Sequence, residues 1–272
     1  MTAPRSLWSQ IVLLVVIITV CVFPFYWMVT TSLKTQIVAL EAPPVWLFEP
    51  TLNNYREALF EDGVLRTLIN SLVVAISTTL LALILGVPAA FALARFEFRG
   101  KKDLWFWFIT NRMASPIVLA LPFFLIARNL GLLDKHITLI LIYLTFNLPI
   151  VIWIVTDQFR GIPYDLDEAA RLEGASQFTI MRKICLPLAM PGVAVSAIFS
   201  FIFSWNELMF GLILTRTEAK TAPAMAVSFM EGYSLPYGKI MATSTLIVIP
   251  VLIFALLASK QLVRGLTMGA VK

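Results

Sequence analysis

Six long apolar segments constrain this chain more than any other feature of its sequence. They cover approximately residues 11–33, 68–93, 104–126, 137–156, 193–214 and 241–259. A helix needs about 20 mostly apolar residues to cross the hydrocarbon core of a bilayer, and each segment is close to that length or longer. Four segments carry no charged residue, whereas the third contains Arg112 and the fifth contains Glu207. The sequence therefore predicts an all-α integral membrane protein with six transmembrane helices.

The composition agrees with a lipid environment. Of the 272 residues, 59% are hydrophobic and 14% are charged, whereas about a quarter of the residues in a soluble domain are charged. Lipid is the expected solvent for apolar surface that one globular core cannot bury. Basic residues do not form a run with interleaved aromatic residues, so we expect no nucleic-acid partner.

The distribution of basic residues predicts the orientation in the membrane. With the N-terminus inside, the inner segments hold twelve lysines and arginines and the outer segments hold eight. The short loop from Arg95 to Lys102 alone contributes four of the twelve. Because cytoplasmic loops are enriched in lysine and arginine, we expect both termini in the cytoplasm. The first apolar segment, Ile11–Leu33, is too long for a signal peptide and is expected to be a retained helix.

Motifs for catalysis and metal binding are missing from the sequence. The pairs Gly100-Lys101 and Gly238-Lys239 lack the upstream glycine and the following Ser or Thr of a phosphate-binding loop. Cys21, Cys185 and the single histidine, His136, do not have metal-ligand spacing. We therefore expect no enzyme activity, no cofactor and no metal site in this chain.

The polar loop between the fourth and fifth apolar segments reads PYDLDEAARLEGASQFTIMRKICLP. Acidic residues in its first turn favour a helix, and Asp167 and Arg171 are spaced to pair on it. Gly174 suits the end of that helix. Ser176 suits the N-cap of a second short helix, which Pro187 is expected to end.

Local chemistry leaves two interpretations of this loop open. It can be an amphipathic segment that lies on the membrane surface. Alternatively, the small side chains of Ala169 and Ala170 let the surface of another protein approach closely.

The same loop resembles the EAA loop of the transmembrane subunits of ABC importers. That pattern is Glu-Ala-Ala, three residues, Gly, nine residues, Ile, one residue and Leu-Pro. It is matched by Glu168, Ala169, Ala170, Gly174, Ile184, Leu186 and Pro187. The resemblance implies a type I importer fold. It also implies that the loop forms a cytoplasmic coupling helix, between helices 4 and 5, that docks on an ATPase subunit.

The resemblance extends over most of the chain and points to the sugar-importer branch, of the MalG type. It rests on Asn53-Asn54-Tyr55, Asn70-Ser71, the loop from Arg95 to Lys102, Pro122, Trp205-Asn206-Glu207 and the C-terminal sequence GLTMGAVK. Family members often end GLTAGAVKG, so Met268 departs from the pattern. The implied divisions are residues 1–67 (first helix and outer loop), 68–262 (transmembrane domain) and 263–272 (cytoplasmic tail). In the tail, Leu266, Thr267 and Gly269 are expected to contact the ATPase.

The resemblance implies a function and a set of partners. The chain would form half of the translocation pathway for a sugar or sugar-like solute in a bacterial inner membrane. Its partners would be a second, different permease, two copies of an ABC ATPase that use ATP and Mg²⁺, and an extracytoplasmic solute-binding protein. The alternative is a self-sufficient, ion-coupled carrier or channel, for which the intramembrane carboxylate of Glu207 is the main support.

Polar residues inside the apolar segments are candidates for the translocation path. They are Arg112, Asn147, Trp205, Asn206 and Glu207. Trp205 offers a ring face and its two neighbours offer hydrogen-bonding groups, which suits a polyhydroxylated ligand. A polar clamp between helices is the other interpretation of Glu207, and Arg112 and Asn147 can equally stabilise helix packing.

Overall fold

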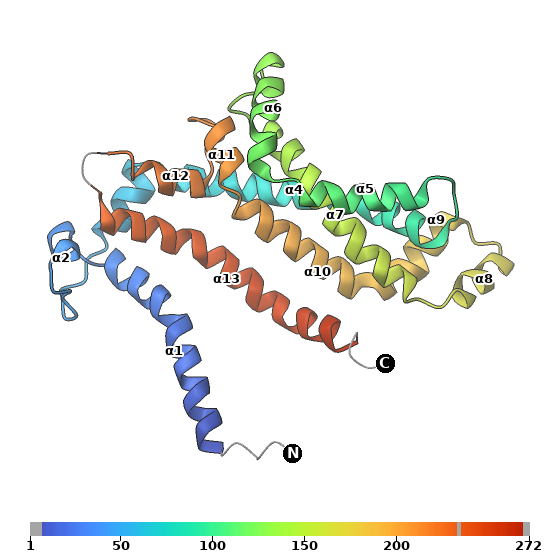
Figure 1. Cartoon of the computed structure of the whole chain (residues 1–272), viewed down its shortest axis with the longest axis horizontal. Helices are drawn as coiled ribbons and strands as arrows, with labels where there is room; N and C mark the ends of the chain where they lie inside the picture. Colours follow the sequence, from blue (N-terminus) through green and yellow to red (C-terminus); the bar gives the residue numbers. More distant parts are fainter. Residues whose placement is uncertain (1–6, 233–234, 269–272) are drawn as a thin grey trace. The chain divides into compact units, whose positions relative to one another are not determined.

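The structure, a computed structural model, describes residues 7–232 and 235–268, except for the side chains of Leu7, Arg112 and residues 257–268. Within this part every regular element is a helix, which confirms the prediction of an all-α protein (Figure 1). The chain forms two compact units. Unit 1 comprises residues 1–66 and 225–249, and unit 2 comprises residues 67–224 and 250–272.

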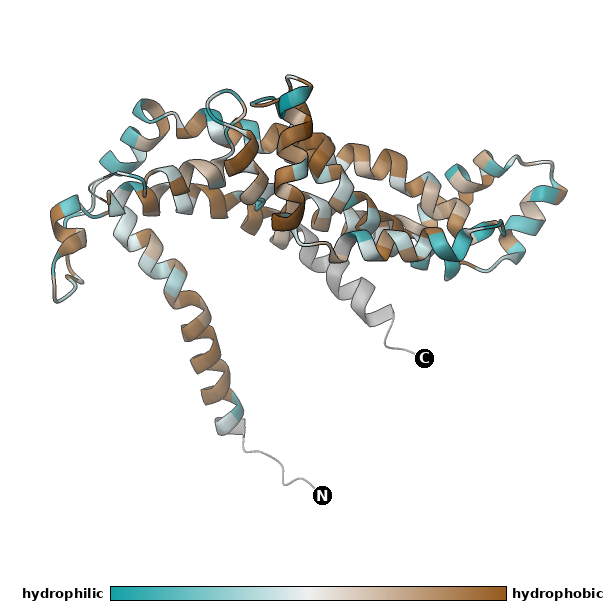
Figure 2. Ribbon diagram, turned by 45° about the horizontal axis from the view of Figure 1, so that its top comes forward, coloured by the Kyte–Doolittle hydropathy of each residue, from teal (hydrophilic) through white to brown (hydrophobic). Residues whose placement is uncertain are grey.

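Five helices among the described residues are long and apolar enough to cross a membrane, or six if one bent pair is a single span. The five are built from α1 (Leu7–Ser32), α4 (Val64–Arg95), α7 (His136–Arg160), α10 (Leu186–Trp205) and α13 (Tyr237–Met268). Figure 2 shows hydrophobic residues along these helices and hydrophilic residues around the loops. The bent pair is α5 (Lys101–Met113) and α6 (Pro116–Asn129), which meet at 96°.

Two of the predicted spans differ from the observed helices. The third was expected to be continuous over residues 104–126, but it breaks at Ala114 and Ser115, whose ψ angles are 126° and 129°. Pro116 explains the break, because a residue before proline is pushed out of the helical region. The fifth was expected over residues 193–214, but α10 ends at Trp205 and a separate helix begins at Met209.

The remaining elements are short. They are α2 (Gln36–Leu40), α3 (Asn53–Arg56), the π-helix η1 (Glu57–Glu61), α8 (Asp165–Leu172), α9 (Gln177–Ile180), the π-helix η2 (Met181–Cys185), α11 (Met209–Leu214) and α12 (Ala222–Ser228). Figure 1 shows α8 and α9 at the end of unit 2 where α7 ends and α10 begins.

In unit 1, the side chains of Asn54 and Tyr55 hold the segment that follows α1. The side-chain amide of Asn54 donates to the carbonyl oxygens of Ser32 and Lys34, both at 2.8 Å. Tyr55 and Ser32 share a further hydrogen bond of 2.6 Å between their hydroxyls. The amide of Asn54 thus donates to carbonyls at and just after the end of α1, where a helix leaves them without a partner. By contrast, the membrane-spanning window of α1 contains no buried residue.

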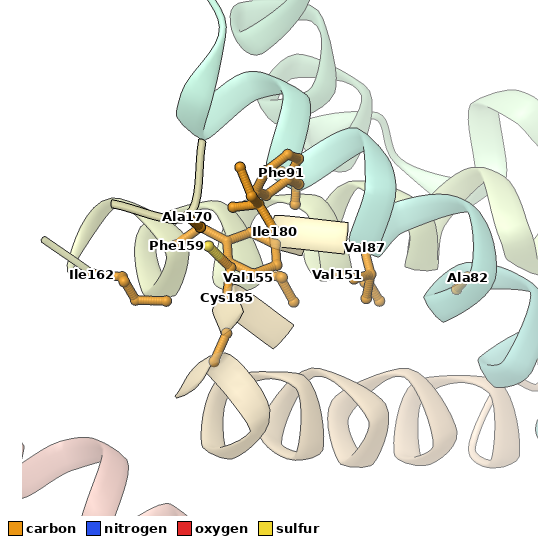
Figure 3. Packing of buried hydrophobic residues seen from close by; sticks show 12 residues of the cluster. Ala82, Val87, Phe91, Val151, Val155, Phe159, Ile162, Ala170, Ile180 and Cys185 are labelled. Atoms are coloured by element: carbon orange, nitrogen blue, oxygen red, sulfur yellow. The ribbon is translucent and has the colours of Figure 1, made fainter. Parts of the chain in front are cut away.

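Unit 2 is built around α7, in whose apolar window 61% of the residues are buried. Gly86 of α4 lies so close to α7 that a Cβ there would come within 2.7 Å of Val151 Cγ1. At the end of α7, Phe159 packs edge-to-face on Phe91 of α4, with ring centroids 5.6 Å apart. Figure 3 shows these aromatic residues in one cluster with Ala170 of α8. The core of unit 2 therefore continues from the long helices into the EAA loop (residues 163–187).

A proline inside α7 leaves one backbone carbonyl without its helical donor. Pro149 has no N–H, so the carbonyl of Thr145, four residues earlier, loses its usual partner. The side-chain amide of Asn111 on α5 donates to this oxygen at 3.0 Å. In lipid such a group has no water to replace the missing donor. Asn111 therefore fixes α5 against the proline of α7.

We predict that Asn111→Ala destabilises the protein by about 0.5–1.5 kcal/mol, the net value of one hydrogen bond. In a Pro149→Ala background the cost should largely disappear, because the alanine supplies the N–H that the carbonyl of Thr145 lacks. Thermal unfolding in detergent of the four members of this cycle measures the difference. Thr110→Ala is the control, since the hydroxyl of Thr110 bonds within its own helix, to Phe106. Equal losses in both backgrounds would contradict the assignment.

Candidate functional site

The first helix of the EAA loop ends as its sequence predicts. Gly174 has a φ angle of +82°, and its N–H donates to the carbonyl of Arg171 at 3.0 Å. The N–H of Ala175 donates to the carbonyl of Ala170 at 2.9 Å. This pair of bonds is the Schellman arrangement, which favours glycine at the left-handed position. The predicted stop of the helix at Gly174 is confirmed.

The second helix of the loop begins as predicted but does not end at Pro187. Ser176 Oγ accepts a hydrogen bond from the N–H of Thr179 at 3.3 Å, so Ser176 is the N-cap of α9. The chain then continues through η2 into α10, and Pro187 lies in the first turn of α10. Pro187 has no N–H to donate, and the wider π-turn before it accommodates the missing hydrogen bond. The predicted stop at Pro187 is therefore wrong.

The seven residues of the EAA pattern divide into an exposed group and an anchored group. Glu168, Ala169, Gly174 and Pro187 are exposed. Ala170 belongs to the buried cluster of Figure 3, against which Ile184 and Leu186 also pack. One part of the pattern thus faces outward while the other holds the loop on unit 2.

Large apolar side chains stand beside the exposed group. Leu172 is 91% exposed and Phe178 is 65% exposed. Apolar side chains at a polar surface are typical of a site that contacts another protein or a membrane. Both interpretations left open by the sequence therefore fit this arrangement.

The expected pair of Asp167 and Arg171 on α8 does not form. Asp167 is fully buried and pairs with Arg95, at the end of α4, with Nε and Oδ2 2.8 Å apart. Arg171 lies instead over the ring of Tyr164, with its guanidinium carbon 5.4 Å from the centroid. Spacing within a helix could not reveal a partner on α4, which is why the prediction is wrong.

Glu207 combines with Tyr143 at the break after α10. The carboxylate accepts hydrogen bonds from the backbone N–H groups of Met209, Phe210 and Gly211 at 2.9–3.3 Å, and thereby caps α11. Tyr143 Oη on α7 donates to the same carboxylate at 2.8 Å. These bonds explain why the chain breaks at this point. They also match the interhelical clamp considered for Glu207.

Asn147 lies one helical turn from Tyr143 and has one hydrogen-bonding group unused. Its amide nitrogen donates to the carbonyl of Tyr143 at 2.8 Å and to Ser204 Oγ at 3.1 Å. Its amide oxygen is buried and has no partner among the described residues. Asn147, Tyr143 and Glu207 line a cavity of about 200 Å³ that reaches the break between α5 and α6. The side chains of Asn147 and Glu207 thus lie beside one cavity within the membrane-spanning part.

The other path candidates lie elsewhere. Trp205 is 2% exposed, and its ring stacks on Phe201 at 5.8 Å, so its face is covered. Asn206 is exposed, and its side chain donates to the carbonyl of Ile202. Arg112 belongs to α5, but its side chain lies outside the described residues. The structure thus brings together Asn147 and Glu207 but not the whole predicted set.

The tail residues expected to contact an ATPase can be placed only in part. Leu266 and Thr267 belong to the last turn of α13, and their side chains are not described. Gly269 lies outside the described residues. The tail contact stays a prediction.

Comparison with known proteins identifies the family. Residues 82–268 match the family described as binding-protein-dependent transport system inner membrane component. The chain belongs to this family. The trehalose permease SugB of Mycobacterium tuberculosis is 39% identical over 252 residues, which cover 92% of each chain. The trehalose/maltose permease MalG of Thermococcus litoralis is 35% identical over 259 residues, which cover 93% of this chain and 92% of the relative.

Solved structures show the same fold. A chain of a bacterial ABC transporter that imports the acidic polysaccharide alginate superposes with a TM-score of 0.74 at 23% identity, over 95% of this chain and 99% of that chain. A chain of the methionine transporter MetNI gives a TM-score of 0.62 at 19% identity, over 77% of this chain and 98% of that chain. The permease therefore has the architecture of an ABC importer transmembrane subunit.

Sequence reasoning missed a polar clamp on the loop that follows α11 of this permease. The carboxylate of Asp134 accepts hydrogen bonds from the four consecutive backbone N–H groups of residues 216–219, at 2.9–3.1 Å. Partial burial raises the pKa of Asp134, but the four amides outweigh it and hold the pKa well below its usual range. Asn70 bonds the carbonyls of Glu218 and Lys220, and His136 bonds Asn70. Asp134 has a positive φ of 57°, a conformation that Asp tolerates better than most residues.

We predict that Asp134→Ala exposes the amides of residues 216–219 to hydrogen exchange, whereas Asp134→Asn has a smaller effect. Asn keeps one acceptor oxygen and tolerates a positive φ, but Ala does neither. Hydrogen-exchange mass spectrometry of the permease measures both, with the exposed Asp103→Asn as control. Unchanged exchange in Asp134→Ala would contradict the clamp.

The same carboxylate predicts a pH dependence. Its pKa in the folded chain lies below the value of about 3.9 in an unfolded chain. Its contribution to stability is therefore fully present above that value and is lost as the pH falls toward the folded pKa. Protection of residues 216–219 should thus persist at pH 5, where an ordinary exposed carboxyl begins to protonate.

Proposed function

We propose that this permease forms half of the translocation pathway of an ATP-driven importer for a sugar or sugar-like solute. The observation that carries the proposal is the EAA loop, which is anchored on the core of unit 2 through Ala170 and presents Glu168, Ala169 and Gly174 at its surface. A coupling helix needs both properties, because it must contact the ATPase and pass its motion to the helices of its own chain.

The solute class follows from relatives. Full-length relatives at 30–39% identity are named as permeases for trehalose, trehalose/maltose, diacetylchitobiose and sulfoquinovosyl glycerol. All of these solutes carry many hydroxyl groups. The cavity beside Asn147 and Glu207 lies among the membrane-spanning helices and has polar residues in its wall, and we assign it to the path.

The partners are a second permease, two ABC ATPase subunits that bind ATP and Mg²⁺, and an extracytoplasmic solute-binding protein. The membrane window of α1 contains no buried residue, which leaves its surface to lipid or to another subunit such as the second permease. The permease crosses the bacterial inner membrane six times, with α5 and α6 as one span. The EAA loop and both termini then face the cytoplasm, as the twelve inner cations indicate.

The coupling role predicts the effect of two surface substitutions. In the assembled transporter in proteoliposomes, Glu168→Ala and Gly174→Asp should each lower ATP-driven uptake at least tenfold. Glu168 is exposed, so its truncation disturbs no internal packing. A Cβ at Gly174 meets no atom within 4 Å, but the φ of +82° strains any residue other than glycine, so Glu168→Ala is the cleaner of the two tests. Asp165→Ala, another exposed acid in the same turn, is the control. Full uptake and ATPase stimulation in both variants would show that the loop does not dock.

The path assignment predicts a different phenotype for Glu207→Gln. This variant keeps the size of the side chain but removes its charge, so the wall of the cavity changes and the EAA loop does not. Uptake should weaken mainly through a higher KM for the solute, with the ATP consumed per solute unchanged. Initial uptake rates over a range of concentrations measure it, with Asn206→Ala as the exposed neighbour. An unchanged KM would assign Glu207 to helix capping alone.

A further inference from the structure

One buried ion pair lies where the EAA loop meets the end of α4. Arg95 is the last residue of α4 and Asp167 lies in the first turn of α8, and their side chains are 5% and 0% exposed. Arg95 Nε and Asp167 Oδ2 lie 2.8 Å apart as an ion pair without a well-directed hydrogen bond. Arg95 Nη2 also donates to Asp167 Oδ1 at 3.4 Å.

The ion pair also contacts the segments that follow α7 and precede α10. Arg95 Nη2 donates to the carbonyl of Ile162, just after α7, at 3.1 Å. Cys185 Sγ in η2, just before α10, lies 3.4 Å from Asp167 Oδ1. The guanidinium also lies 5.6 Å from the centroid of the Tyr164 ring. Two side chains thus connect α8 with the ends of α4, α7 and α10.

Few other contacts connect α8 with the helices. Its buried side chains are those of Asp167 and Ala170. Ala170 contributes a single methyl group to the cluster of Figure 3. Asp167 is therefore a direct polar connection between α8 and the ends of the long helices.

Stability alone does not account for the pair. The cost of removing two charges from water roughly offsets their attraction, so a hydrophobic contact of similar size would stabilise the fold as well. What the pair adds is a connection, because the guanidinium of Arg95 contacts the carboxylate of Asp167 and the carbonyl of Ile162 at the same time. We propose that Arg95 and Asp167 are positioning residues that transmit the motion of the EAA loop to α4. This inference rests on the proposed coupling function.

The test compares three transporters reconstituted in proteoliposomes with the ATPase subunits. They carry the wild-type permease, the apolar pair Arg95→Met with Asp167→Leu, and the control pair Asp157→Leu with Arg160→Met. The control removes an exposed ion pair of 3.6 Å, with side chains 56% and 45% exposed, at the end of α7. The readout is the amount of solute taken up per ATP hydrolysed.

We expect the apolar pair to assemble and hydrolyse ATP but to take up at least tenfold less solute per ATP than the wild type. The control pair should remain within twofold of the wild type. A purely structural role would lower the yield or the melting temperature without changing this ratio. A wild-type ratio in the apolar pair would overturn the inference.

A second variant covers the case in which the apolar pair does not assemble. Arg95→Lys keeps the charge but replaces the planar donor set by a single ammonium, so it should assemble and show a lowered ratio. A wild-type ratio in Arg95→Lys would then overturn the inference. Failure of the proposed function has a different signature, namely wild-type uptake without ATP, and that result would overturn both.

Discussion

Lipid gives the backbone no substitute for a lost hydrogen bond, and this constraint explains the structure from its helices to its polar residues. Pro149 removes a donor within α7, and Asn111 of α5 supplies another. The break between α10 and α11 leaves several N–H groups free, and Glu207 accepts from them. At both places a polar side chain lies in an apolar segment because the backbone requires it there.

This constraint also changes how intramembrane polar residues are interpreted. Glu207 as an isolated carboxylate suggested either a ligand site or the ion site of a carrier. In the structure its oxygens are already used by α11 and by Tyr143, which weakens the case for an ion-coupled carrier. The amide oxygen of Asn147 is a covered acceptor without a partner among the described residues, which costs free energy.

The sequence predicted those features that depend on local chemistry. Segment length and hydropathy located the long helices, and the glycine at position 174 and the serine at position 176 marked the ends of two short ones correctly. Predictions failed where a distant partner decides. Asp167 pairs with Arg95, which is 72 positions away, rather than with Arg171 on its own helix. The wrong stop at Pro187 has a local cause instead, because the π-turn just before it accommodates a residue without an N–H.

The division of the EAA pattern into two groups has a consequence for how such transporters diversify. Ala170, Ile184 and Leu186 pack against the interior of their own chain, whereas Glu168, Ala169 and Gly174 are exposed. If the exposed group docks on an ATPase, as proposed, exchange of one ATPase for another would require changes in that group alone. A shared ATPase serving several permeases needs only a common outward surface, while the helices behind it remain free to adapt to different solutes.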